Sequence, residues 1–126
     1  MSKQIIQTIN APVPIGPYNQ AVKTGNLLFV SGQVALKPGT NEFANADIIE
    51  ETHQVLQNVK AILAEAGMDF GNIVKTTIFL SDMALFGQVN EIYAQYFDRD
   101  FPARETVAVK GLPKNANVEI SVIAAS

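Results

Sequence analysis

The stretch FPARETVAVKGLPKNANVEI, residues 101–120, contains two strand-like segments joined by a turn region with glycine and proline. Successive side chains of a strand point to opposite faces, so Arg104 and Thr106 share a face in the first segment. Glu119 and Ser121 share one in the second for the same reason. The short connection predicts antiparallel pairing of the two segments, with their valines matched on the buried face. This register would place a cation, a carboxylate and two hydroxyls on one surface.

The two charges on that surface have two interpretations. An arginine at a strand edge is commonly a solvated surface charge in a weak salt bridge. A carboxylate in an apolar strand needs a partner or water, because burial disfavours its charged form. Pairing of Glu119 with Arg104 or with a lysine therefore explains the carboxylate about as well as a reaction site does. Glu105 is a poor partner for Arg104, because adjacent strand residues face opposite ways.

The composition indicates one compact domain, which we assign to residues 1–126. A chain of 126 residues, 48% hydrophobic and 17% charged, is long and apolar enough to bury a core. Its net charge of −3 gives no long-range attraction to nucleic acids or anionic lipids. It shows no membrane-length apolar stretch and no signal-peptide pattern, so we expect a cytoplasmic protein.

The residue inventory excludes several kinds of chemistry. The chain has no cysteine, so it can form neither a disulfide framework nor a thiol nucleophile. Its single histidine, His53, argues against a zinc site. This histidine lies on a polar stretch of the first expected helix, and we predict that it faces solvent.

The hydrophobic pattern predicts an α+β domain in which two helices cover one face of a sheet. Asp47 and Glu50 form a capping-box pattern at the start of the first helix, and Gly67 is a stop signal at its end. The expected elements are a strand at residues 5–9, a hairpin of strands 21–24 and 27–32, a helix at 48–66, a strand at 73–80, a helix after residue 82, and the two segments described above. A partner subunit is the natural cover for the other sheet face.

Two further segments are suited to approach a ligand. Three prolines within residues 12–17 predict a rigid, extended loop, and Tyr18 follows it directly. The strand at residues 27–30 is continuously apolar, which predicts burial on both faces. It ends at Ser31 and Gly32, where the absence of a glycine side chain lets a ligand approach the backbone.

Several ordered motifs together span nearly the whole chain: IGPY at 15–18, FVSGQ at 29–33, EETxQVLxN at 50–58, PAR at 102–104, LPK at 112–114 and VEI at 118–120. This set resembles the RidA (YjgF-type) family of reactive-intermediate imine deaminases. The resemblance implies a chorismate-mutase-like α+β fold, assembled as a homotrimer with sites between subunits. It implies hydrolytic deamination of 2-imino acids and enamines, such as 2-aminoacrylate, to 2-keto acids and ammonia. It implies that no metal and no organic cofactor take part.

The resemblance also implies a role for each site residue. Arg104 would grip the substrate carboxylate through two parallel donors, and Glu119 would orient or activate the attacking water. The remaining substrate-binding positions would be Tyr18, Ser31, Gly32 and Thr106. Many family members have cysteine where Thr106 stands, so a thiol-dependent step cannot operate here. Glu105 replaces a residue that is usually small, and would be a rim charge or an intersubunit salt bridge.

Two other functions remain open. The same pocket could hold a small carboxylate as a regulatory signal without turnover. The family is also associated with endoribonuclease and translation-inhibitor activity. The acidic balance and the lack of a basic–aromatic stripe argue against action on RNA. We therefore expect small 2-imino and 2-keto acids as ligands, further copies of the chain as partners, and neither nucleic acid nor a membrane.

Overall fold

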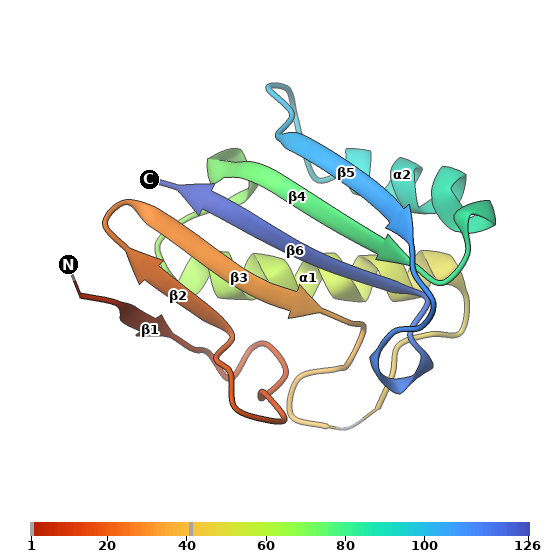
Figure 1. Ribbon diagram of the computed structural model, residues 1–126, viewed down its shortest axis with the longest axis horizontal. Helices are drawn as coiled ribbons and strands as arrows, with labels where there is room; N and C mark the ends of the chain where they lie inside the picture. The colour runs from red at the N-terminus through yellow and green to blue at the C-terminus, as the bar shows by residue number, and fades with distance from the viewer. Residues whose placement is uncertain (1, 41) are drawn as a thin grey trace.

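The computed structural model describes residues 2–40 and 42–126, and it forms one six-stranded sheet with both helices behind it (Figure 1). The strands are β1 (Gln4–Ile6), β2 (Ala21–Thr24), β3 (Leu27–Gln33), β4 (Ile73–Leu80), β5 (Ala103–Ala108) and β6 (Val118–Ala125). The helices are α1 (Ile48–Glu65) and α2 (Phe86–Ala94), with single 3₁₀ turns η1 (Phe70–Asn72), η2 (Met83–Leu85) and η3 (Pro113–Asn115). The predicted α+β class, with two helices on one face of a mixed sheet, is confirmed.

Helix α1 begins and ends where its capping signals predict. The Asp47 side chain accepts a hydrogen bond from the Glu50 amide at 2.8 Å, and Glu50 reaches back to accept from the Ala46 amide at 3.2 Å. The helix ends before Gly67, which adopts a φ of 73° that favours glycine. These caps satisfy backbone groups that the helix itself cannot.

The hydrophobic core lies between the helices and the sheet. Its largest fully buried side chains are Leu28, Leu56, Ile62, Leu63, Ile78, Leu80 and Ile120. Truncating any of these to alanine would cost about 2–5 kcal/mol, because the packed surroundings cannot collapse fully into the cavity. The core therefore holds rigid the strands that carry the candidate site.

The two segments of residues 101–120 do not pair with each other, so that prediction was wrong. The sheet order is β1-β2-β3-β6-β4-β5, in which β6 is antiparallel to β3 and β4, and β5 is parallel to β4 at the edge. Strand β6 buries every second side chain, whereas β5 buries none completely. Burial of apolar area favours β6 in the centre of the sheet and leaves β5 at its edge.

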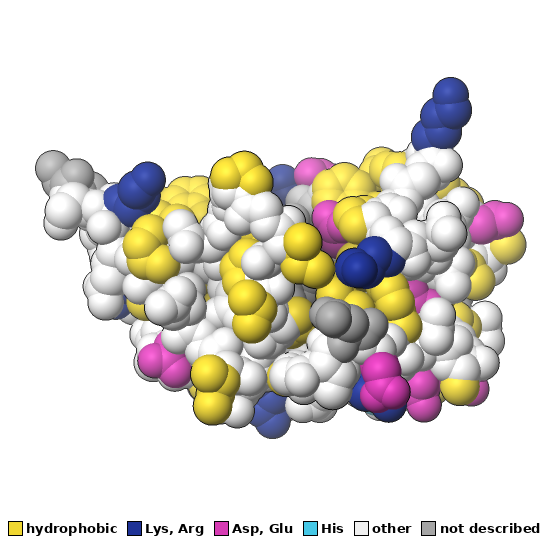
Figure 2. All heavy atoms as spheres, turned by 90° about the horizontal axis from the view of Figure 1, so that it is seen from below, with side chains coloured by type: hydrophobic (Ala, Val, Ile, Leu, Met, Phe, Trp, Pro, Cys, Tyr) yellow, Lys and Arg dark blue, Asp and Glu magenta, His cyan; other side chains and the backbone are white. Residues whose placement is uncertain are grey.

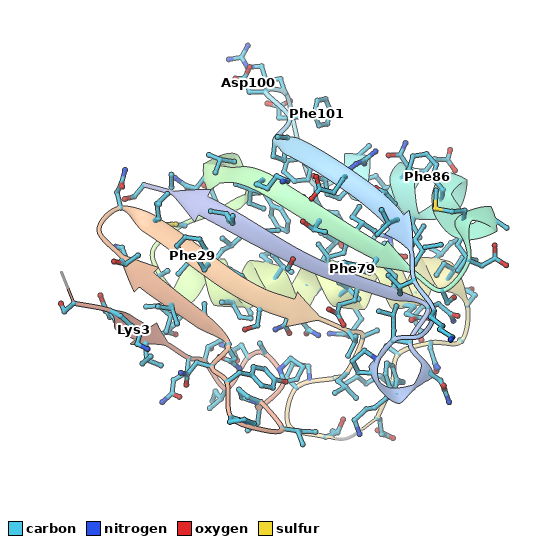
Figure 3. All side chains as sticks on the ribbon, viewed as in Figure 1. Lys3, Phe29, Phe79, Phe86, Asp100 and Phe101 are labelled. Carbon is cyan, nitrogen blue, oxygen red and sulfur yellow. The ribbon has the colours of Figure 1, made fainter. Side chains whose placement is uncertain are left out.

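The sheet face turned away from the helices is open in the single chain. Leu28 and Val30 are buried beneath the helices, but Phe29 between them is 42% exposed on the open face (Figure 3). Two-sided burial of residues 27–30 is therefore wrong for the single chain, because the helices cover only one face. Coverage of the open face by a partner subunit stays a prediction.

The remaining departures from prediction are local. Strand β1 ends at Ile6 rather than at residue 9, because the Thr8 backbone bonds to the Gln20 side chain instead of a neighbouring strand. His53 is half-buried rather than solvent-facing. Its Nδ1 lies 2.7 Å from the hydroxyl of Tyr96, which follows α2 in the chain.

Candidate functional site

Arg104 projects from β5 toward helix α2. Its Nη1 donates a hydrogen bond to Asn90 Oδ1 at 2.7 Å. The centre of its guanidinium lies 5.1 Å from the ring centroid of Tyr93 and 5.6 Å from that of Phe86. These distances allow cation–π attraction, so two rings and one amide hold the arginine in place. Among the described residues it makes no other side-chain hydrogen bond, which leaves further N–H donors for a ligand.

Tyr93 supports this arginine from within the core. Its hydroxyl donates to Thr76 Oγ1 at 2.9 Å, and its side chain is buried. Burial raises the pKa of the Tyr93 phenol, although the Thr76 hydrogen bond and the Arg104 charge pull it down. The phenol therefore stays neutral at ordinary pH and acts as a rigid support.

A pocket of about 450 Å³ opens beside the arginine, lined by Asn90, Tyr93, Ala94, Phe101, Pro102 and Arg104. Its volume is in the range usual for small-molecule sites. Mixed polar and apolar walls with one cation suit a small organic anion, since the guanidinium can bind a carboxylate through paired hydrogen bonds.

Thr106 shares the arginine's face of β5, two residues further along. Its Oγ1 is buried and has no hydrogen-bond partner among the described residues. A buried hydroxyl without a partner is costly, and most such groups in proteins find one. Thr106 therefore offers a free hydrogen-bonding group on the same side of the strand as Arg104.

Glu119 lies on the opposite face of the sheet from Arg104. Arg104 is in register with Thr76 of β4, whereas Glu119 is in register with Phe79, three residues further along β4. Positions three apart on a strand face opposite ways. The predicted shared surface is therefore wrong for a single chain, because its parity argument assumed that β5 and β6 were neighbours.

The Glu119 carboxylate lies across Gly32. A Cβ atom placed on Gly32 would sit 2.8 Å from Glu119 Cδ and closer still to Oε2. Gly32 lies where the register between β3 and β6 shifts, between Val30 and Gln33. Burial raises the pKa of Glu119, because the half-buried site disfavours the charged form. A carboxyl group with a raised pKa accepts and releases its proton at a higher pH than an exposed one does, as a general base or acid requires.

Tyr18 and Gly32 line a second, smaller pocket of about 40 Å³, walled by the prolines of the loop before Tyr18. The hydroxyl of Ser31 donates to the Asn19 carbonyl at 2.6 Å, and its amide donates to the Gln20 carbonyl at 2.9 Å. Ser31 therefore fixes the backbone beside Gly32. The structure thus brings Tyr18, Ser31, Gly32 and Glu119 to one region, and Arg104 with Thr106 to another.

The surface around this loop is partly apolar. Viewed from below, hydrophobic side chains lie scattered among polar ones across the left and centre of the molecule (Figure 2). Ile9, Val13 and Ile15, on the segment between β1 and β2, are the most exposed of the large hydrophobic residues in the described chain. Exposed apolar groups beside a candidate site are typical of an interaction surface.

Three residues that hold Arg104, namely Phe86, Asn90 and Tyr93, were not among the predicted site residues. The signal was present, since an asparagine four residues after Phe86 and three before Tyr93 lies on the same helix face as both. Glu105 pairs within the chain, with its carboxylate 3.3 Å from Lys75 Nζ. Lys75 therefore balances the charge of Glu105 within the same chain.

The described residues offer neither a metal site nor a membrane-spanning helix. No group of three or more histidine, aspartate or glutamate side chains in residues 2–40 and 42–126 is placed to hold a metal ion. Within the same residues, neither helix has the length and apolar character needed to cross a membrane.

Residues 8–126 match the model of the Endoribonuclease L-PSP family. The chain belongs to this family. It is 49% identical to a RutC family protein of Pyrococcus horikoshii, over 97% of both chains. It is 46% identical to the mouse 2-iminobutanoate/2-iminopropanoate deaminase, over 97% of this chain and 90% of the relative. The crystal structure of Escherichia coli TdcF with bound serine superimposes with a TM-score of 0.93, at 42% identity over 98% of each chain. The resemblance to the RidA family is confirmed.

Proposed function

We propose that the protein hydrolyses reactive 2-imino acids and their enamine tautomers, such as 2-aminoacrylate, to 2-keto acids and ammonia. The observation that carries this proposal is the anchored Arg104 guanidinium, with free donors facing a pocket of suitable size. The name of the mouse relative supports the same reaction.

The proposed reaction needs little more than positioning and one proton acceptor. Arg104 binds the substrate carboxylate and fixes the imine carbon. Water adds to the carbon of the protonated imine while Glu119 takes one proton from the water, which forms a neutral carbinolamine. Glu119 then returns the proton to the nitrogen, the C–N bond breaks and ammonia leaves. The hydroxyl passes its proton to Glu119 as the keto group forms, and this proton ends on ammonia, so that the iminium ion and water give the keto acid and ammonium.

We further propose that each site is shared by two subunits of a homotrimer. The backbone of the sheet separates Arg104 from Glu119 within one chain. A substrate held by Arg104 and Thr106 of one subunit would meet Tyr18, Gly32 and Glu119 of a neighbour. The open sheet face, with Phe29 and Val107 exposed, supplies apolar surface for such an assembly.

The test is a coupled assay in which a pyridoxal-phosphate-dependent dehydratase supplies 2-aminoacrylate and keto-acid formation is followed with and without the protein. We expect the wild-type protein to accelerate the reaction, and Arg104→Ala and Glu119→Gln to abolish most of that acceleration. Arg99→Ala is the matched control, because Arg99 is exposed in the segment before β5. No acceleration by the wild type, or equal acceleration by Arg104→Ala, would overturn the proposal.

A second candidate is carboxylate binding without turnover, which is favoured by the serine bound to the TdcF relative. The two functions differ in what they ask of Glu119. Binding alone requires Arg104 but tolerates Glu119→Gln, whereas hydrolysis requires both. Saturable keto-acid binding that survives Glu119→Gln, without any turnover by the wild type, would select this candidate.

A further inference from the structure

The side chain of Gln20 is a buried polar centre that the proposed chemistry does not use. Only 2% of its surface is exposed, and both the oxygen and the nitrogen of its amide form hydrogen bonds with backbone groups. Its Oε1 accepts from the Thr8 amide at 2.7 Å. Its Nε2 faces the carbonyls of Thr8, Ala11 and Pro12 at 3.0, 3.3 and 2.9 Å. One side chain therefore satisfies the backbone of a whole segment.

That segment has few other sources of order. Strand β1 ends at Ile6, so residues 8–12 have no neighbouring strand to bond with. The prolines at 12 and 14 have no N–H to donate. The Gln20 amide takes the place of a strand partner, and without it buried backbone groups would lack hydrogen bonds. The path of the loop thus depends on this side chain together with the buried Ala11 and the fixed φ angles of the prolines.

The same loop forms a wall of the candidate site. Pro12, Val13 and Pro14 line the small pocket together with Tyr18 and Gly32. The backbone of residue 20 is tied to the opposite wall, because its carbonyl accepts from the Ser31 amide. Gln20 therefore links the proline loop to the strand segment over which Glu119 lies.

We propose that Gln20 is a positioning residue that sets the proline loop and Tyr18 at the correct distance from Gly32 and Glu119. This inference rests on the proposed function, since it assigns Gln20 a role at the same site. Its side chain supports the binding wall and also borders the small pocket. The Gln20 backbone carbonyl, which holds Ser31, persists in any substitution at this position. Loss of the amide should therefore weaken substrate binding and spare the step at Glu119.

The decisive variant is Gln20→Met, which keeps the side-chain length and removes every hydrogen bond of the side chain. We expect KM for 2-aminoacrylate to rise about 5- to 10-fold, with kcat within about twofold of wild type. By NMR, we expect faster hydrogen exchange at the Thr8 amide and shifted Tyr18 ring resonances. Gln4→Met is the control, because Gln4 is exposed on β1. If Gln20→Met does not fold, Gln20→Asn, whose amide is too short to span the same carbonyls, takes its place.

Each outcome decides the question. A raised KM with preserved kcat and shifted Tyr18 resonances supports the positioning role. Unchanged KM and unchanged Tyr18 resonances overturn it, as does a fall in kcat with KM preserved. If the wild-type protein hydrolyses no imine, the proposed function fails separately. The Tyr18 and Gly32 resonances, with the affinity for pyruvate measured by NMR titration, then decide the role of Gln20 alone.

Discussion

The side chains of Arg104 and Glu119 leave one sheet on opposite sides. Arg104 is level with Thr76 and lies against helix α2, whereas Glu119 is level with Phe79 and lies across Gly32 on the open face. The strand backbone separates the two groups. A small imino acid that contacts Arg104 must therefore find its proton acceptor on another chain, if Glu119 is that acceptor.

The first prediction is complementation between two inactive variants. When Arg104→Ala and Glu119→Gln chains are mixed at equal amounts, refolded and allowed to assemble, some shared sites combine an intact arginine with an intact glutamate. For random assembly we expect about a quarter of the wild-type activity in the coupled deaminase assay. Each variant refolded alone is the control. Activity in the mixture no greater than the sum of the two controls would contradict a site shared between subunits.

The second prediction concerns Asn90, which anchors Arg104 at 2.7 Å. Asn90→Ala frees the guanidinium to sample other rotamers, so we expect KM to rise about 3- to 10-fold, the equivalent of one hydrogen bond, with a smaller change in kcat. Asn90→Asp should raise KM further, because its carboxylate would compete with the substrate for the guanidinium.

Gln88→Ala is the matched control for both Asn90 variants, since Gln88 is exposed on the same helix. Steady-state kinetics over a range of dehydratase-generated imine concentrations separates KM from kcat. If both Asn90 variants match wild type in KM, the anchor does not contribute to binding.

The elements could be predicted from local chemistry, but the order of the strands could not. The caps at Asp47 and Gly67 and the β-branched run of β4 act within a few residues, so sequence alone revealed them. The placement of β6 between β3 and β4 depends on burial summed over the whole sheet. The short connection between residues 108 and 118 suggested instead that β5 and β6 pair with each other. Motif resemblance predicted Arg104 and Glu119 as site residues, but only the register shows that they face opposite ways.

The third prediction is that Glu51 is a structural rather than a catalytic carboxylate. It is 1% exposed, and its Oε2 accepts from the amides of Asn117 and Val118 at 2.7 and 3.3 Å. Its Oε1 accepts from Asn117 Nδ2 at 3.1 Å. Glu51→Ala would leave these donors unpaired at the start of β6, so we expect the free energy of unfolding to fall by about 2–4 kcal/mol.

Urea denaturation measures this loss, with Glu91→Ala as the control because Glu91 is exposed on α2. A loss equal to that of the control would show that solvent replaces the bonds at Glu51.

The fourth prediction links the pKa of Glu119 to both activity and stability. Burial raises its pKa above the usual 4.5, so the fold favours the protonated form. The stability that this preference contributes is present at acid pH and is lost as pH rises through the folded-state pKa. Glu119→Gln cannot ionise, so we expect it to be inactive yet to melt at a higher temperature than wild type at pH 7.

The difference in melting temperature should shrink below pH 4, where wild-type Glu119 is protonated too. The acid limb of the wild-type activity profile should have its midpoint above 4.5, because hydrolysis needs the carboxylate form. An equal melting difference at both pH values would refute the linkage.

The fifth prediction separates the geometry of Glu119 from the stability of the fold. In Gly32→Ala the new methyl group would meet Glu119 Cδ at 2.8 Å, so the carboxylate must move. The displaced atoms are the end of a flexible side chain, and the φ of Gly32 lies outside the left-handed region, so the backbone need not change. We therefore expect kcat to fall at least about tenfold, because a general base displaced from its water loses most of its effect. The melting temperature should stay within a few degrees of wild type, since no core packing is lost.

Gly87→Ala, where the added methyl meets open space, is the matched control. If Gly32→Ala keeps full activity at wild-type stability, the position of the carboxylate over Gly32 is not the catalytic one, and the proton acceptor must be sought elsewhere.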